Sequence, residues 1–251
     1  MFELSGKLGL VTGGSRGIGA ATALLLARAG ADVAITFRSR ASDAERVAAE
    51  IRQLGRAAAV YRVELSDSVA VDRMYERISA EWGRLDLFVG NAGIWPVEEV
   101  PVRDMPDQRW RRTIAEDLDS IFYSTRGALR LMGRGGRVVL VSSTAGQRGE
   151  ALHADYAAAK GAVISFVKSL AMEVARAGIT VNCVAPGWVD TEMCAEVFAG
   201  GGRGEIERSI PVGRVATPED IAAPIVFLCS AEARHITGEI LNVNGGSVLC
   251  G

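Results

Sequence analysis

A glycine-bearing turn near the start of the chain constrains the fold more than any other feature. Residues 8–11 read Leu-Gly-Leu-Val, residues 17–29 have helical composition, and Gly13, Gly17 and Gly19 follow the spacing G-x-x-x-G-x-G. Such a turn reverses the chain sharply, brings backbone N–H groups to a pyrophosphate and packs a helix against a strand without intervening side chains. The spacing alone is weak evidence among 29 glycines, but the strand before it and the helix after it are the context of dinucleotide binding.

Short apolar runs and longer helical stretches alternate along most of the chain. Further strands are expected at 32–37, 57–63, 85–89, 137–141, 179–184 and 240–243, and helices at 42–54 (capped by Ser42), 67–82, 107–132 and 154–176. Continuous apolar strands that alternate with helices indicate an α/β fold, in which helices cover both faces of a doubly wound parallel sheet. No linker or repeat divides residues 1–251, so we predict a single domain.

Residues 188–211 break this alternation and contain the run Gly200-Gly201-Gly202-Arg203-Gly204. A surface insertion and a mobile lid both fit a glycine-bearing segment. We favour a substrate lid, because loops at the carboxyl ends of parallel strands hold ligands.

Charge and cysteine usage exclude several classes of protein. The chain has 28 basic and 30 acidic residues, so nothing in its charge indicates a nucleic-acid partner. Its four cysteines (Cys183, Cys194, Cys229 and Cys250) form no C-x-x-C pair, which argues against a disulfide framework or a metal site. With no signal peptide and no apolar run of about 18 residues, we expect a cytoplasmic protein without a membrane partner.

The end of the second strand bears on the choice of cofactor. NAD(H) is held there by a carboxylate on its ribose, but this strand ends in Phe37-Arg38-Ser39-Arg40, with no acid before Asp43. Arg38 can pair with a 2′-phosphate, Ser39 can add a hydroxyl, and Arg16 in the glycine turn is a second basic candidate. We therefore predict NADP(H), with NAD(H) as the alternative if these arginines are only solvated surface charges.

Tyr156 and Lys160 lie four residues apart in a predicted helix, on one face. A free phenol has a pKa of about 10, and a fixed cation beside it lowers that value toward working pH. Such a tyrosine can donate a proton to a carbonyl oxygen or accept one from an alcohol. Ser142 and Ser143 end the strand before this helix, and either hydroxyl could bind the substrate oxygen.

With these residues the chain resembles the short-chain dehydrogenase/reductase family, and most closely its 3-oxoacyl-acyl-carrier-protein reductase branch. The resemblance rests on residues 12–19, 91–93, 186–187 and 238–246 together with Ser143, Tyr156, Lys160 and Asn182. It implies a single Rossmann-type domain with a seven-stranded parallel sheet, hydride transfer between nicotinamide C4 and a carbonyl or carbinol carbon, and a homotetramer.

The resemblance also implies roles for individual residues. Tyr156 is the acid/base, Lys160 holds the nicotinamide ribose and tunes Tyr156, and Ser143 rather than Ser142 binds the substrate oxygen. The implied cofactor-binding residues are Gly13, Ser15, Arg16, Gly17, Ile18, Gly19, Arg38, Ser39, Glu64, Leu65, Asn91, Ala92, Gly93, Tyr156, Lys160, Pro186, Gly187, Val189 and Thr191.

The chain departs from the family pattern at two positions. Asp117 stands where the family has its fourth catalytic residue, an asparagine, and Glu64 stands where relatives carry aspartate. An ionised aspartate accepts hydrogen bonds but cannot donate them. A carboxylate near Lys160 would counter its charge and raise the pKa of Tyr156, so we expect an active enzyme with a raised pH optimum.

The resemblance makes a ketone of the 3-oxoacyl thioester type the expected substrate, with acyl-carrier protein as a candidate partner that presents it. One alternative is an NAD(P)-dependent alcohol dehydrogenase of a sugar, a steroid or a secondary metabolite. Another is a non-catalytic nucleotide-binding regulatory protein, which Asp117 keeps open and the Ser143, Tyr156 and Lys160 set opposes. Candidate pocket residues are Trp95, Gln147, His153, Trp188, Met193 and Phe198. His153 could contact the substrate, but its place on a polar loop favours the alternative that it is a surface residue.

Overall fold

The computed structural model describes residues 2–249, which form a seven-stranded parallel sheet. The strand order is β3-β2-β1-β4-β5-β6-β7, so the order reverses between β1 and β4. The strands are β1 (Leu8–Val11), β2 (Asp32–Phe37), β3 (Ala58–Arg62), β4 (Leu85–Gly90), β5 (Met132–Val141), β6 (Thr180–Pro186) and β7 (Ile240–Val243). The predicted doubly wound α/β fold is confirmed.

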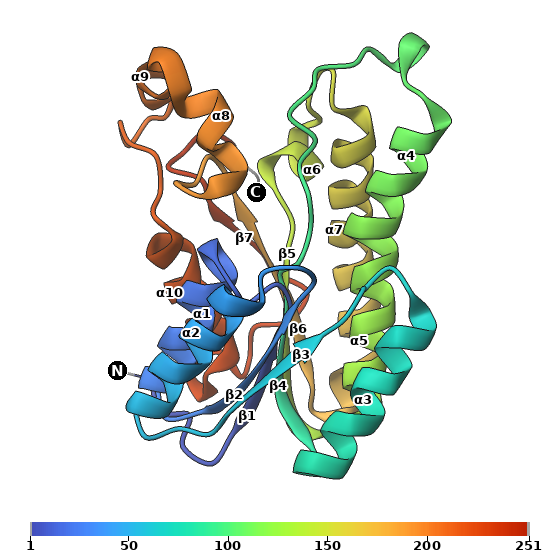
Figure 1. The fold of residues 1–251 in the computed structure, drawn as a ribbon, viewed down its shortest axis with the longest axis vertical. Helices are drawn as coiled ribbons and strands as arrows, with labels where there is room; N and C mark the ends of the chain where they lie inside the picture. The colour runs from blue at the N-terminus through green and yellow to red at the C-terminus, as the bar shows by residue number, and fades with distance from the viewer. Residues whose placement is uncertain (1, 250–251) are drawn as a thin grey trace.

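Helices cover both faces of the sheet (Figure 1). α1 (Gly17–Arg28), α2 (Ala41–Gln53) and α10 (Pro218–Cys229) pack on one face, and α3 (Ser68–Trp82), α5 (Ser120–Leu131) and α7 (Ala154–Val174) pack on the other. Neighbouring residues of a strand pack into the hydrophobic cores on opposite faces of the sheet. Val11 packs in the core with α1, and Leu10 packs in the core with α3. Burial on both faces explains why the strands are continuously apolar.

The helices expected at 17–29, 42–54, 67–82 and 154–176 have ends within two residues of those observed, whereas the strand expected at 137–141 already begins at Met132. Asp67 caps α3, because its carboxylate accepts hydrogen bonds from the N–H groups of Val69 and Ala70. The predicted cap at Ser42 is wrong: α2 begins at Ala41 with Arg40 before it, and no side chain caps the helix.

The helix expected at 107–132 contains an irregularity that periodicity did not reveal. α4 (Asp107–Ile114) and α5 are joined by a π-helical turn, η2 (Ala115–Asp119), and the helix ends at Leu131. Wider turns of this kind often mark functional sites. Asp117 lies in the middle of the turn and is buried.

The segment at 188–211 is mostly helical. It contains η4 (Glu192–Cys194), α8 (Ala195–Phe198), η5 (Ala199–Gly201) and α9 (Gly202–Ser209). Gly200 and Gly201 have φ angles of 62° and 97°, a region that favours glycine, and they separate the two α-helical pieces. Whether the segment moves as a lid stays a prediction.

All seven strands run in the same direction, so their carboxyl ends share one edge of the sheet. The glycine turn follows β1, Asn91 follows β4, Ser142 follows β5 and Gly187 follows β6. In open parallel sheets, ligands bind at this edge, near the point where the strand order reverses.

The sequence predicts neither a membrane-spanning segment nor a metal site, and residues 2–249 can be examined for both. No helix there is long and apolar enough to cross a membrane, and no cluster of side chains there has the composition of a metal site. Cys183, Cys194 and Cys229 are free thiols, whereas Cys250 lies outside the described residues.

Candidate active site

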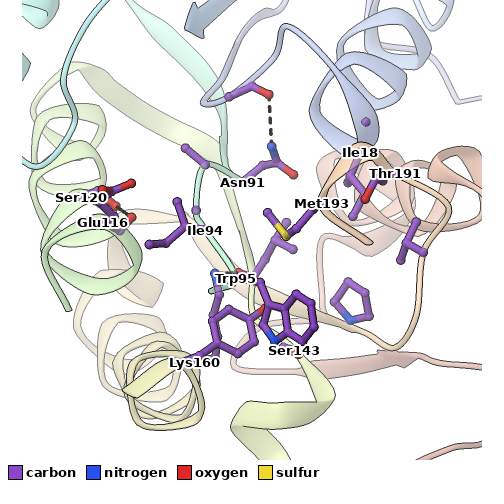
Figure 2. Close-up of a pocket in the computed structure, with 18 of the residues that line it drawn as sticks. Ile18, Asn91, Ile94, Trp95, Glu116, Ser120, Ser143, Lys160, Thr191 and Met193 are labelled. Carbon is purple, nitrogen blue, oxygen red and sulfur yellow. Dashed lines mark hydrogen bonds between the residues drawn. The ribbon is translucent and has the colours of Figure 1, made fainter. Parts of the chain in front are cut away.

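A cavity of about 350 Å³ lies along the carboxyl edge of the sheet. Its wall contains every predicted cofactor-binding residue except Gly19, which packs beneath the glycine turn, and also contains Ser143, Tyr156 and Lys160. Figure 2 shows Trp95, Ser143 and Lys160 gathered in one region, with Ile18 and Thr191 close together in another. One continuous space therefore joins the glycine turn to the Tyr156 region.

Steric contacts explain why the turn needs glycine. Gly13 has a φ angle of 64°, and a Cβ atom there would lie 3.1 Å from the Cα of Ala92. A Cβ atom on Gly19 would lie 2.3 Å from the carbonyl oxygen of Gly13. Gly14 lies outside the predicted spacing but is also required, because a Cβ atom there would lie 2.6 Å from the Cβ of Ile35. The Gly14 N–H also donates to the carbonyl oxygen of Thr36 at 3.0 Å, so β2 approaches the turn closely, which the spacing of the other glycines did not show.

Asn91 connects the ends of β1 and β4. Its Nδ2 donates to the carbonyl oxygen of Thr12 at 3.0 Å, while the Thr12 hydroxyl accepts from the backbone N–H groups of Asn91 at 2.9 Å and Ala92 at 3.1 Å. On the other side of the turn, Thr36 accepts from the N–H of Gly13 at 3.1 Å. These bonds hold the turn in one conformation before any ligand arrives. Thr36 was not singled out from the sequence.

Tyr156 and Lys160 lie on α7 and are both buried. The Lys160 Nζ is 5.7 Å from the centroid of the Tyr156 ring. Burial raises the pKa of Tyr156, the charge of Asp117 raises it further, and a hydrogen bond with Ser143 opposes both effects. The lowering of the Tyr156 pKa expected from Lys160 is therefore wrong, because burial of the phenol, and after it the charge of Asp117, raises that pKa.

The two strand-end serines have different surroundings. The Ser142 hydroxyl is buried and donates to the carbonyl oxygen of Lys160 at 2.8 Å, which ties β5 to α7. Ser143 precedes α6 (Thr144–Arg148) and is half-buried, and its hydroxyl accepts from the N–H of Ala145 at 3.1 Å. Both serines line the cavity, but only Ser143 is partly exposed.

Asp117 forms a buried ion pair with Lys160. The Asp117 Oδ1 is 3.3 Å from the Lys160 Nζ and accepts from the N–H of Ile94 at 3.0 Å, and the two side chains are 0% and 5% exposed. Burial raises the pKa of Asp117, while Lys160 and the Ile94 N–H oppose that rise. Its Oδ2 is buried and has no partner among residues 2–249. A Cβ atom on Gly93 would lie 2.3 Å from Oδ1, so glycine is required beside the pair.

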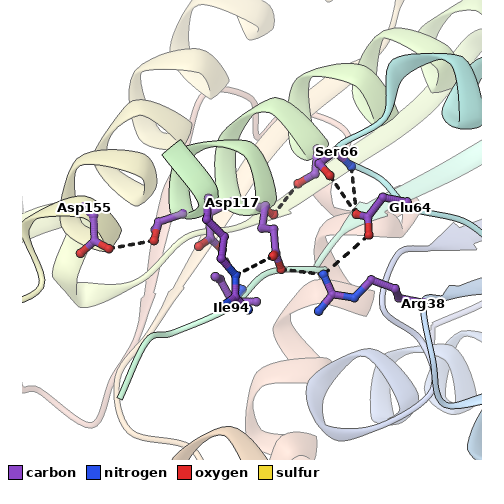
Figure 3. A network of polar contacts seen from close by, with 10 residues as sticks. Arg38, Glu64, Ser66, Ile94, Asp117 and Asp155 are labelled. Carbon is purple, nitrogen blue, oxygen red and sulfur yellow. Dashed lines mark hydrogen bonds and ion pairs between the residues drawn. The ribbon is translucent and has the colours of Figure 1, made fainter. Parts of the chain in front are cut away.

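The three arginines at the nucleotide end of the cavity all meet carboxylates. The Arg38 Nη1 is 2.8 Å from the Glu116 Oε2 and 3.7 Å from the Glu64 Oε2, as Figure 3 shows in part. Arg16 and Arg40 both pair with Glu192. Glu116 and Glu192 were not predicted as site residues, since nothing in their local sequence indicates that they face arginines from distant elements.

Aromatic side chains line the region around Tyr156. Trp95, Trp188 and Met193 line the cavity as expected, and the two tryptophans meet edge to face with their ring centroids 5.7 Å apart. Phe198 packs behind Trp188 with centroids 6.0 Å apart. Glu150, which was not predicted, also lines the cavity, and burial raises the pKa of its carboxyl group.

Three expectations about this region are wrong. Phe198 packs against Trp188 but does not line the cavity. His153 is not a surface residue: it is buried and stacks on Trp95 with the ring centroids 5.0 Å apart. Gln147 does not line the cavity, because its amide donates to Asn242 of β7 at 2.6 Å.

Known proteins resemble this chain over almost all of its length. The family model described as enoyl-(acyl carrier protein) reductase matches residues 13–247. The 3-oxoacyl-[acyl-carrier-protein] reductase FabG of Escherichia coli (strain K12) is 40% identical over 247 residues, which is 98% of each protein. The chain belongs to the short-chain dehydrogenase/reductase family. The resemblance expected from the sequence is thereby confirmed.

Solved structures of short-chain dehydrogenases/reductases share the fold. A short-chain dehydrogenase from Burkholderia cenocepacia J2315, in complex with NADP, has a TM-score of 0.91 and 36% identity, covering 98% of this chain and 99% of that one. A dehydrogenase/reductase from Sinorhizobium meliloti 1021 has a TM-score of 0.92 and 33% identity, covering 98% and 97%. The chain is an oxidoreductase that acts on CH–OH and C=O groups, and its family uses NAD(P)(H).

The cavity fits such a cofactor. The glycine turn leaves no room for side chains where a pyrophosphate would approach backbone N–H groups, and guanidinium groups lie beyond the end of β2. Asn91, Pro186, Gly187, Val189 and Thr191 line the remaining wall.

Proposed function

We propose that this enzyme uses NADPH to reduce a ketone, and that 3-oxoacyl thioesters are its substrate class. The observation that carries the proposal is the shared cavity, in which Tyr156 and Ser143 lie in one region and Arg16, Arg38 and Arg40 in another. The 40% identity to a protein named 3-oxoacyl-[acyl-carrier-protein] reductase supports the thioester. The NADP complex of a structural neighbour supports the cofactor.

Tyr156 and Ser143 act on the substrate oxygen in this mechanism. The Ser143 hydroxyl donates a hydrogen bond to the carbonyl oxygen, which stabilises the negative charge that develops there. The reduced nicotinamide supplies the hydride when it is bound. Tyr156 donates its phenolic proton to the same oxygen, and the ammonium of Lys160, on the same face of α7, stabilises the resulting phenolate. Gly187, Val189 and Thr191 line the nicotinamide side, and Lys160 holds the nicotinamide ribose.

Asp117 adjusts this chemistry toward reduction. Its carboxylate offsets the charge of Lys160 and raises the pKa of Tyr156. A phenol with a raised pKa keeps its proton at neutral pH, and the protonated form is the one that reduction consumes. We therefore assign Asp117 to the catalytic group with Ser143, Tyr156 and Lys160, and we place the pH optimum above that of a relative with asparagine at this position.

Arg16, Arg38 and Ser39 bind the 2′-phosphate of NADPH in this proposal, and NAD(H) is the weaker cofactor. Arg38 is half-exposed at the mouth of the cavity, where its planar group can take two phosphate oxygens. Glu64 and Leu65 line the same mouth beside the adenine. Glu64 also accepts from the Ser66 hydroxyl at 2.9 Å, so its longer side chain is held in place.

Two partners belong to the proposal. Acyl-carrier protein presents the thioester, and a homotetramer forms through exposed faces such as that of α5 and α7. On that face Phe122 is 43% exposed and its ring centroid lies 6.3 Å from that of Phe166, while the Arg126 guanidinium lies 5.2 Å from the Phe122 ring. Light scattering coupled to gel filtration tests the tetramer.

The decisive experiment follows NADPH oxidation against a panel of ketones that includes acetoacetyl thioesters. Tyr156→Phe removes the proton donor and should lower kcat by about 10²-fold or more while the Kd for NADPH changes little. Turnover that survives Tyr156→Phe would contradict the mechanism. Oxidation of sugar or steroid alcohols without ketone reduction would favour the alcohol dehydrogenase alternative. Tight NADPH binding without turnover on any substrate would favour a regulatory protein.

A further inference from the structure

The arginines around the nucleotide end of the cavity divide into two groups by their carboxylate partners. Arg38 meets Glu116, which is only 15% exposed and is also held by the Nε of Arg112 at 3.0 Å. Arg16 and Arg40 share a different carboxylate, that of Glu192: its Oε2 contacts the Arg16 Nη1 and lies 3.2 Å from the Arg40 Nη2.

Glu192 reaches these arginines from the other side of the cavity. It begins η4, directly after Thr191, and so belongs to the 188–211 segment. That segment rests on the glycine turn: a Cβ atom on Gly17 would lie 3.2 Å from the Thr191 Cγ2. The contact between Glu192 and the two arginines therefore joins the turn after β1, the start of α2 and the segment after β6.

Of the two carboxylates that pair with these arginines, that of Glu192 can be displaced more readily than that of Glu116. Its side chain is 56% exposed, and within residues 2–249 its carboxylate contacts only Arg16 and Arg40. Exposed ion pairs of this kind contribute little to stability. Glu116, in contrast, is largely buried between two arginines on a helix that packs in the core.

A carboxylate held between two guanidinium groups occupies a place that also suits a phosphate monoester. A phosphate carries a charge of about −1.5 to −2 and presents three strong acceptor oxygens, so it competes well for the same donors. Arg16 lies in the glycine turn, directly before α1, and Arg40 follows the strand whose end meets the ribose.

We propose that Glu192 is a specificity-determining residue: its carboxylate occupies Arg16 and Arg40, and Arg16 is a ligand that the 2′-phosphate of NADP(H) needs beside Arg38 and Ser39. This inference rests on the proposed use of NADP(H). The phosphate of NADP(H) must displace the Glu192 carboxylate, whereas NAD(H) can bind with that contact in place. The displacement also removes the ion pairs that link the start of the 188–211 segment to Arg16 and Arg40, which couples the choice of cofactor to the wall of the substrate region.

Glu192→Gln tests the inference, and Glu205→Gln is the matched control. Glu205 carries the same charge on the same segment, is exposed, and forms no ion pair within the described residues. Calorimetry on the full chain compares adenosine 2′,5′-bisphosphate with adenosine 5′-monophosphate at low ionic strength. We expect Glu192→Gln to lower the Kd of the bisphosphate about threefold to fivefold and to leave that of the monophosphate within about twofold. The gain should fade at about 0.5 M salt, and Glu205→Gln should show no such gain.

Several outcomes would overturn the inference: an equal change for both nucleotides, no change, weaker binding of the bisphosphate, or the same gain in Glu205→Gln. Ketone turnover measured on the same preparations separates this failure from failure of the proposed function. If the enzyme reduces ketones but the nucleotide preference does not respond to Glu192, only the role of Glu192 is refuted. If no ketone is reduced, the proposed reaction is refuted whatever the nucleotide data show.

Discussion

Replacing Asp117 with asparagine should move the pH profile of the enzyme toward acid. In the wild-type protein the Asp117 carboxylate lies 3.3 Å from the ammonium of Lys160, and both side chains are buried. The Asp117→Asn substitution keeps the size of the side chain and removes its negative charge. Because Asp117 raises the pKa of Tyr156, loss of the carboxylate should lower that pKa.

The distances set the scale of the shift. At an effective dielectric constant of about 20, unit charges 3.3 Å apart interact by about 5 kcal/mol, so the carboxylate largely offsets Lys160. A unit charge 5.7 Å from the centroid of the Tyr156 ring stabilises the phenolate by about 3 kcal/mol, which corresponds to about 2 units on the pH axis. This is the largest movement of the pH profile that an uncompensated Lys160 can cause. Glu150 and Cys194 also raise the pKa of Tyr156, but they are present in both proteins and cancel in the comparison, so we expect the pH profile of the variant to move toward acid by no more than this limit.

The assay is the pH dependence of kcat/KM in both directions. Alcohol oxidation needs the phenolate, so its rate rises through the pKa of Tyr156, and this limb should move to lower pH in Asp117→Asn. Ketone reduction needs the phenol, so its alkaline limb should move in the same direction. Unchanged limbs would refute the electrostatic argument. A collapse in turnover at every pH would show that Asp117 has a catalytic role of its own.

The stability of the same variant provides a control for folding. Because burial raises the pKa of Asp117 in the folded protein, its ionisation costs stability, and that cost appears as the pH rises. The neutral amide avoids the cost. Thermal unfolding should therefore give Asp117→Asn a Tm equal to or above that of the wild type at pH 8, and the difference should shrink toward acid. A large loss of Tm at pH 8 would contradict this sign.

Two further substitutions test other parts of the structure. Arg38→Asp places a carboxylate at the cavity mouth and should raise the KM for NADPH about tenfold or more while improving the use of NADH; an unchanged preference would remove Arg38 from the phosphate site. Arg109→Met removes the partner of the fully buried Asp155, whose Oδ2 is 3.1 Å from the Arg109 Nε. Burial alone would raise the pKa of Asp155, but hydrogen bonds from Arg109 and Thr113 lower it below its usual value. Loss of the arginine should cost about 3 kcal/mol of unfolding free energy in urea titrations, and a cost under about 1 kcal/mol would refute the pairing.

The order of strands and helices could be predicted from the sequence because it depends on local patterns. Runs such as residues 32–37 are apolar on both faces and so predict buried parallel strands, and β2 has these bounds. Tyr156 and Lys160 share one face of their helix wherever that helix lies in the fold, so their proximity could also be predicted. The glycine turn belongs to the same class, since its conformational needs are set within a few residues.

The remaining parts of the site depend on contacts between distant segments. The π-helical turn around Asp117 leaves no signature in the apolar spacing, because the same residues can form a regular α-helix. The burial of His153 follows from its packing on Trp95, which comes from another loop.

Local sequence determined that the chain would form a doubly wound sheet with a glycine turn and a tyrosine–lysine helix face, because each is set by residues a few positions apart. Only the tertiary structure decided which charges meet. Asp117 pairs with Lys160 of a different helix, and Glu192 is 176 positions from Arg16. An electrostatic interaction depends on distance in space and on burial, and neither can be obtained from the order of residues.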